Sequence, residues 1–160
     1  MTLDILLKIE TVEGESKIKG HEKEIDVLSW SWGMTQSVSM HFGSGGGTGK
    51  VDIQDIRLTK YVDKSSPVLL KYCCNGKHFT KATLTVRKPG NKPFEYFKIN
   101  MEPLLISSIS IGGQNGEDRL TENVSLNFGK FEVIYTPQKA DGTAEAEIPQ
   151  KWNIATNAES

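Results

Sequence analysis

Residues 29–67 read SWSWGMTQSVSMHFGSGGGTGKVDIQDIRLTKYVDKSSP, and this stretch decides the fold class. Two runs of alternating apolar and polar residues flank a glycine-rich tip, a pattern typical of a long β-hairpin. Glycine supplies the positive φ values that hairpin tips require. The stretch ends in Ser-Ser-Pro, which is typical of a helix start.

The glycine-rich tip is followed by Lys50, which raises the question of a nucleotide site. A phosphate loop needs Gly-x-x-x-x-Gly-Lys-Ser/Thr, with a helix beginning at the lysine and a hydroxyl that binds magnesium. Ser44 stands at the first glycine position and Val51 at the hydroxyl position. The dinucleotide pattern fails too, because Thr48 occupies the place of its third glycine. A flexible hairpin tip is the better interpretation, and no cofactor is predicted.

Length and charge exclude several classes of protein. The chain has 160 residues and a net charge of −1, so we expect a single domain over residues 1–160 and no basic field that would hold nucleic acid. No apolar run reaches the roughly 18 residues of a membrane span, so no membrane insertion is expected. The N-terminus lacks the basic start and long apolar centre of a signal peptide. We therefore expect a cytoplasmic protein or one exported without a cleaved signal.

Period-2 alternation dominates the chain and predicts most of its elements as strands. They are expected at residues 3–9, 24–33, 36–42, 50–61, 77–88, 94–101, 104–111 and 120–136, the last either unbroken or interrupted at Gly129-Lys130. Residues 88–91, Lys-Pro-Gly-Asn, predict a turn between two of them. From about residue 138 the tail is expected to be loosely packed except around Trp152.

One helix is expected after the hairpin. Ser65 or Ser66 is expected to cap it, Pro67 suits its first position, and Asn75-Gly76 suits its end. Its apolar face is expected to hold Val68, Leu69, Tyr72 and Cys73. One short helix and eight or so strands favour a mainly β fold, either a closed or nearly closed antiparallel barrel or a sandwich.

The predicted strand at residues 24–33 has two unlike faces. One carries Leu28, Trp30 and Trp32, and the other carries Val27, Ser29 and Ser31. The tryptophan face is suited to a core, whereas the serine face fits either a solvated wall or an ordinary half-exposed strand. The arms of the following hairpin exceed the usual five or six residues. The unpaired edges of its strands predict a binding partner. If the partner is another copy of the chain in head-to-tail contact, a ring closes or a filament grows.

No residues are arranged as a catalytic or metal site. His21, His41 and His78 stand near polar loops or strand ends without a second histidine at ligand spacing, and we interpret them as solvated or hydrogen-bonded. No Gly-x-Ser-x-Gly elbow surrounds the serines near residue 107. Cys73 and Cys74 are adjacent, and two reduced thiols on the helix is the favoured interpretation, with an intermolecular disulfide as the alternative.

Taken together, several segments resemble the haemolysin-coregulated protein (Hcp) family, the tube subunits of type VI secretion systems, over nearly the whole chain. The resemblance rests on the order and spacing of Gly14-Glu15-Ser16, Ile25-Asp26-Val27, Trp30-Ser31-Trp32-Gly33, Gly49-Lys50, Asp63-Lys64-Ser65-Ser66-Pro67, Ile106-Ser107-Ser108, the run from Glu117 to Val124, and Trp152-Asn153. It implies a compact β-barrel with a helix on one side. It also implies a homohexameric ring whose copies stack into a tube inside a contractile sheath, carry a spike and small effector proteins, and are exported.

The resemblance also assigns roles to residues. The lumen wall would include Ser29 and Ser31, with Ser31 the expected cargo contact. The arm that reaches a neighbouring subunit would comprise His41, Phe42, Gly43, Ser44, Gly45, Gly46, Gly47, Thr48, Gly49 and Lys50. Little sequence follows Trp152-Asn153, so a plain tube subunit without a toxin domain is expected. The alternatives are a small β-barrel enzyme, which the missing catalytic constellation disfavours, and a secreted ligand-binding module acting on host or rival cells.

Overall fold

The computed structural model describes residues 2–38, 40 and 49–159, which form ten strands and one helix. The strands are β1 (Asp4–Ile9), β2 (Ile25–Asp26), β3 (Ser29–Ser31), β4 (Met34–Gln36), β5 (Val51–Ile53), β6 (Ile56–Tyr61), β7 (Ala82–Lys88), β8 (Phe94–Gly112), β9 (Thr121–Tyr135) and β10 (Ile148–Asn153), and the helix is α1 (Ser66–Asn75). This confirms the predicted mainly β fold class.

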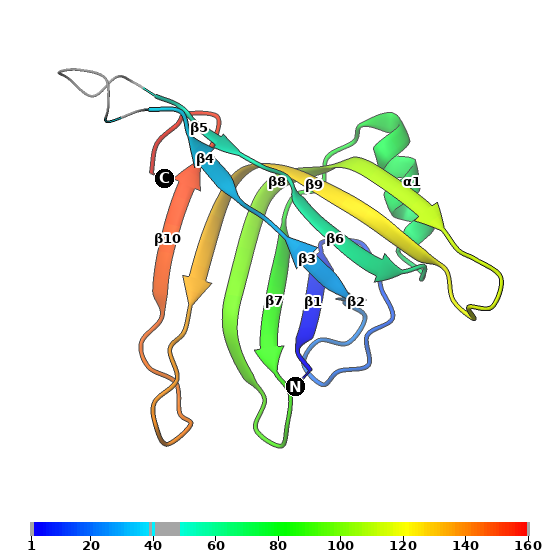
Figure 1. Cartoon of the computed structure of the whole chain (residues 1–160), viewed down its shortest axis with the longest axis horizontal. Helices are drawn as coiled ribbons and strands as arrows, with labels where there is room; N and C mark the ends of the chain where they lie inside the picture. Colours follow the sequence, from blue (N-terminus) through cyan, green and yellow to red (C-terminus); the bar gives the residue numbers. More distant parts are fainter. Residues whose placement is uncertain (1, 39, 41–48, 160) are drawn as a thin grey trace.

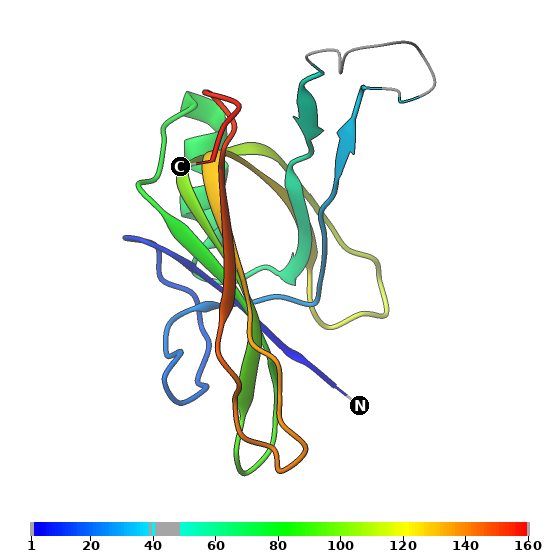
Figure 2. The same cartoon turned by 90° about the vertical axis from the view of Figure 1, so that its left-hand side faces the viewer.

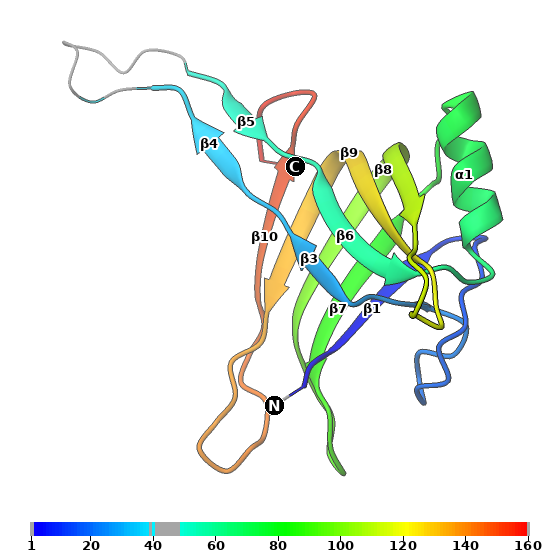
Figure 3. The same ribbon diagram turned by 45° about the vertical axis from the view of Figure 1, so that its right-hand side comes forward.

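The main sheet is antiparallel and strongly curled (Figure 1). Its strand order is β2-β1-β7-β8-β9-β6-β3, with β10 beside β9. The long strands β8 and β9 pair from Phe97↔Tyr135 to Gly112↔Thr121 and form its spine, and Gly129-Lys130 does not interrupt β9. Figure 3 shows β6 and β3 on one wall of the half-barrel and β7 and β1 on the other.

A short chain segment joins the two ends of the curled sheet. Only Val27 and Leu28 separate β2 from β3, which lie at opposite ends of the strand order. The Val27 amide donates to the Ile5 carbonyl in β1 (3.0 Å), and the Leu28 amide donates to the Thr59 carbonyl in β6 (2.8 Å). The segment therefore ties both walls of the half-barrel together.

This crossing corrects the predicted strand at residues 24–33, which is divided into β2 and β3. The predicted faces are wrong for two residues, because Val27 is buried and Leu28 is 46% exposed. Period 2 fails here because the chain changes sheet edge between these residues. Beyond the crossing the prediction is confirmed: Ser29 and Ser31 are exposed, while Trp30 and Trp32 pack against the core.

The barrel interior is filled by the inward side of each strand. Its apolar cluster includes Leu7, Ile25, Ile56, Leu58, Leu84, Ile99, Met101, Ile106, Val124 and Leu126. Trp30 stacks on Phe97 with ring centroids 5.9 Å apart, and Trp32 meets the Phe131 ring edge-on at 4.9 Å. Burial of these aromatic rings fixes which side of β3 faces outward.

The hairpin projects away from the barrel (Figure 2). Its strands β4 and β5 pair only through Met34↔Ile53, Thr35↔Asp52 and Gln36↔Val51. The predicted second arm at residues 50–61 is wrong as one strand, because it is broken into β5 and β6 at Gln54-Asp55, whereas the predicted first arm at residues 36–42 lies partly outside the described residues. The break is held by the Gln54 amide, which donates to the Gly33 carbonyl (3.0 Å).

The predicted helix is confirmed, but its start is capped differently. Ser65 makes no side-chain cap hydrogen bond. Instead the Asp63 carboxylate accepts from the Ser65 amide (2.9 Å), and Gly76 ends the helix at a φ of 66°, where a side chain would be strained. Leu69 is buried as expected, whereas Val68 faces solvent.

The tail contains a strand that alternation did not predict. β10 pairs with β9 from Ile148↔Tyr135 to Asn153↔Lys130. Most of its side chains are exposed and Trp152 is half-buried. Its polar composition and Pro149 hide the strand pattern, because an edge strand with little to bury needs no apolar alternation.

Candidate functional site

Two rows of polar side chains cross four strands on the outside of the half-barrel. In one row Ser29 lies opposite Thr59, which lies opposite Asn123 and then Ser110. In the other, Ser31, Arg57, Ser125 and Ser108 follow one another in the same way. Directly opposed residues of antiparallel strands share a face and lie about 5 Å apart at Cβ. We call these eight residues the polar face.

Inward neighbours hold the polar face in position. Leu58 and Val124 alternate with its residues and are buried in the core, so β6 and β9 cannot turn over without exposing apolar side chains. The Thr59 hydroxyl donates to Asn123 Oδ1 (2.7 Å) and links two strands across the surface. A shallow hollow of about 340 Å³ lies over Ser29, Ser31, Arg57, Thr59, Asn123 and Ser125. The structure thus brings the two predicted lumen serines together in one hollow.

The predicted inter-subunit arm is described only at its base. Gly49 and Lys50 lie among the described residues, whereas His41 to Thr48 lie outside them. The Ser37 hydroxyl donates to the Lys50 carbonyl (3.4 Å). A Cβ atom on Gly49 would lie 1.8 Å from Val38 Cγ2, so this position has no room for a side chain. The chain leaves the polar face through β3, runs into β4, and returns through β5 to β6.

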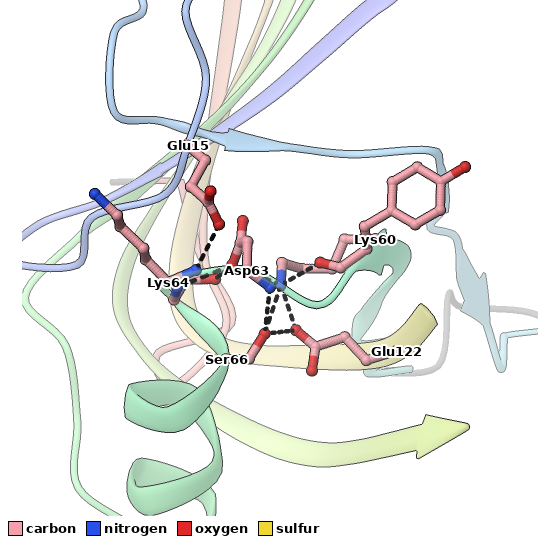
Figure 4. A network of polar contacts seen from close by, with 8 residues as sticks. Glu15, Lys60, Asp63, Lys64, Ser66 and Glu122 are labelled. Carbon is pink, nitrogen blue, oxygen red and sulfur yellow. Dashed lines mark hydrogen bonds and ion pairs between the residues drawn. The ribbon is translucent and has the colours of Figure 1, made fainter. Parts of the chain in front are cut away.

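A buried charged cluster beside the polar face was missed by the sequence analysis (Figure 4). Lys60 and Glu122 are directly opposed on β6 and β9, form an ion pair, and are both fully buried. The Lys60 ammonium also donates to Asp63 Oδ1 (3.0 Å) and to the Ser66 hydroxyl (3.2 Å). Ser66 in turn donates to Glu122 Oε1 (2.6 Å).

This cluster fastens the start of α1 to the barrel wall. Nearby, the Lys64 amide donates to Glu15 Oε2 (3.0 Å), which adds the loop after β1 to the same junction. The Glu122 Oε2 atom is buried without a hydrogen-bond partner among the described residues. Alternation marks Lys60 and Glu122 as inward positions of β6 and β9, but it does not show that the two side chains meet.

His21 is the one described histidine with carboxylate partners. Its Nδ1 atom lies 2.8 Å from Glu24 Oε2, and Nε2 contacts Glu95 Oε1. Partial burial acts to lower the pKa of His21, but the hydrogen bonds and charges of Glu95 and Glu24 outweigh it and raise the pKa above its ordinary value. The predicted hydrogen-bonded role is confirmed for His21. His78 is exposed, and His41 lies outside the described residues.

The remaining candidates form no reactive arrangement. Cys73 and Cys74 are free thiols on α1, half-buried and exposed respectively. Residues 2–38, 40 and 49–159 contain no group of three histidine, cysteine or acidic side chains placed to hold a metal ion. In the same residues no helix has the length and apolarity to cross a membrane.

Comparison with solved structures first defines the class of protein, a type VI secretion protein with this curled antiparallel fold. A structure described as a type six secretion system protein superposes with a TM-score of 0.92 at 28% identity, covering 99% of this chain and 100% of the other. The crystal structure of Hcp1 from Salmonella typhimurium superposes with a TM-score of 0.82 at 36% identity over 100% of both chains.

Sequence comparison gives the particular family. The family model "Type VI secretion system effector, Hcp" matches residues 6–135. Protein hcp1 of Pseudomonas aeruginosa is 53% identical over 162 aligned positions, which cover 100% of both chains. The chain therefore belongs to the Hcp family of type VI secretion proteins, which confirms the family resemblance found from the sequence.

Proposed function

We propose that this chain is a structural tube subunit that forms homohexameric rings, which stack into a tube and carry small effector proteins in the lumen. The observation that carries the proposal is the polar face, in a chain of the Hcp family. A wall of serine, threonine, asparagine and one arginine on the outside of a barrel adds nothing to the apolar core of the isolated subunit. Such a surface suits a water-filled channel through which unlike cargoes pass without being trapped by apolar contacts.

The hairpin supports self-assembly. A two-stranded ribbon is marginally stable by itself, and β4 and β5 pair with each other apart from the main sheet. Met34 is 45% and Met40 91% exposed. Packing the hairpin against a second copy would bury these methionines and cover strand edges that otherwise invite uncontrolled pairing. The residues proposed for this contact are those from His41 to Lys50.

The other partners follow from the tube. The rings lie inside the contractile sheath, end at the spike protein, and leave the cell with the effectors after synthesis in the cytoplasm. The subunit itself performs no catalysis in this proposal; its chemistry is non-covalent contact of Ser29, Ser31 and their neighbours with cargo.

Electron microscopy of the purified full-length protein tests the proposal. We expect rings with six copies around an open centre. Particles without an open centre, or a protein that binds a small ligand as a monomer, would favour a secreted ligand-binding module instead.

A further inference from the structure

Arg57 differs from the other arginines of the chain in having no partner among the described residues. The chain contains three arginines. Arg87 pairs with Asp4 (3.0 Å), and the Arg119 guanidinium lies 3.7 Å from the centre of the Tyr61 ring. Arg57 is exposed in the middle of the polar face, between Ser31 and Ser125.

No carboxylate among the described residues pairs directly with the Arg57 guanidinium. The hydroxyls of Ser31 and Ser125 form no hydrogen bond with another described side chain, so they are available as donors. Asp55, two residues before Arg57, directs its carboxylate to neutral donors instead: it accepts from the Ser107 hydroxyl (2.5 Å) and from Asn127 Nδ2 (2.8 Å). One cation and two available hydroxyls therefore share one row and one hollow.

We propose that Arg57 binds a carboxylate of the cargo, so that this tube favours effectors with acidic surfaces. The guanidinium presents paired N–H donors that match a carboxylate, and the flanking serine hydroxyls can add further donors. The inference rests on the proposed function, because a ring of six copies would repeat Arg57 around the lumen. A positive potential within a narrow channel is screened less than one on an open surface.

Fluorescence anisotropy of blocked peptides tests this contact on the full-length protein at low salt. The probes are acetylated, amidated tetraglutamate and tetraglutamine, and acetylated tetraglutamine with a free C-terminal carboxylate, each with a neutral dansyl label. We expect tetraglutamate to bind about fivefold more tightly than blocked tetraglutamine. If only the third peptide binds more tightly than blocked tetraglutamine, the C-terminus of the cargo chain is identified as the source of the carboxylate.

Arg57→Gln should abolish the preference for tetraglutamate, and Arg57→Lys should retain part of it. The matched control is Lys71→Gln, which removes one exposed positive charge on α1, away from the polar face; it should bind as the unchanged protein does. Equal binding of the charged and uncharged peptides, absent binding, or an unchanged preference in Arg57→Gln would overturn the inference.

The oligomeric mass of each sample separates this inference from the ring. Monomeric unchanged protein would refute the ring itself. Rings whose peptide preference ignores Arg57 would refute only the carboxylate contact. Loss of the ring in Arg57→Gln alone would place Arg57 in a contact between copies and would likewise overturn the inference.

Discussion

At the scale of single residues, the largest contributions to fold stability are expected where a charge is removed from water. The Lys60–Glu122 pair is fully buried, and two ions taken out of water are held only if their mutual attraction and hydrogen bonds offset the lost hydration. Asp63, Ser66 and the Tyr61 carbonyl supply those bonds. The pair therefore ties α1 to β6 and β9, and the lost hydration is offset only while both partners are present.

Glu122→Leu should lower the free energy of unfolding by about 3–5 kcal/mol, because it leaves the Lys60 charge buried without its main partner. The double change Lys60→Met with Glu122→Leu should recover much of that loss. Urea denaturation measures both. Lys81→Met is the control, since its pair with Glu10 is exposed and contributes about 1 kcal/mol or less. A Glu122→Leu protein as stable as the unchanged one would contradict this role.

His21 predicts a pH dependence of stability with a definite sign. Because its pKa is raised in the folded protein, its contacts with Glu95 and Glu24 stabilise the fold fully below its ordinary value of about 6.5. That contribution is lost as pH rises through the folded pKa. The unfolding free energy of the protein minus that of His21→Gln should therefore decrease between about pH 6 and pH 8.

The control for this series is His78→Gln, which changes an exposed histidine. Its difference from the unchanged protein should vary less over the same range. A His21→Gln difference that is constant with pH, or that grows at high pH, would show that His21 is not held as a cation between the two carboxylates.

Among the elements, the segment from β2 to β3 explains both what alternation predicted and what it missed. Ser29, Trp30, Ser31 and Trp32 follow period 2, because β3 has a core on one side and solvent on the other. Val27 and Leu28 do not, because they cross between sheet edges, a tertiary event that local sequence does not encode. The fold class was predictable because most strands follow this alternation. The short pairing of β4 with β5 and the edge strand β10 were not predictable, because they depend on tertiary contacts.

The candidate site was predictable only in part. Family resemblance placed Ser29 and Ser31 on a wall, but it did not reveal Arg57, Thr59, Asn123 and Ser125 beside them. Those neighbours come from strand register between β3, β6 and β9, and pairing of distant strands is set by the whole sheet. The buried Lys60–Glu122 pair was missed because register also decides which inward charges meet.

The base of the hairpin offers a test at the scale of an element. Gly49→Ala places a methyl group against the Val38 side chain, and the strain should displace the hairpin base without disturbing the barrel core. We expect unchanged core stability and a ring that dissociates at about tenfold higher concentration. Thermal unfolding of dissociated protein measures core stability, and sedimentation velocity measures the concentration at which the ring dissociates.

The matched control is Gly112→Ala, because a Cβ atom there meets nothing within 4 Å. It should leave both quantities unchanged. Rings of Gly49→Ala that dissociate like the unchanged protein would remove the hairpin from the proposed subunit contact.

At the scale of the whole molecule, one chain segment would serve both assembly and transport. β3 lies in the polar face, β4 and β5 form the hairpin, and β6 returns to the polar face. In a ring, contact of the hairpin with a neighbour would therefore also set the distance between successive polar faces. Cargo retention is expected to require an intact ring rather than the isolated subunit.

Ser31→Gln tests the lumen assignment. A longer side chain on each copy should crowd the channel while leaving ring mass unchanged, and retention of an effector exported by the same system should fall about tenfold. Co-purification of ring and effector measures retention. Thr80→Gln, an exposed substitution between α1 and β7, is the control and should retain the effector. Equal retention of every effector by both variants would remove Ser31 from the cargo contact.

The mass of the purified protein in solution tests the central claim most directly. Light scattering across a wide concentration range should give six times the 17.7 kDa of the chain, or multiples of that mass if rings stack. A mass of one chain at every concentration would contradict the account of this protein as a self-assembling tube subunit.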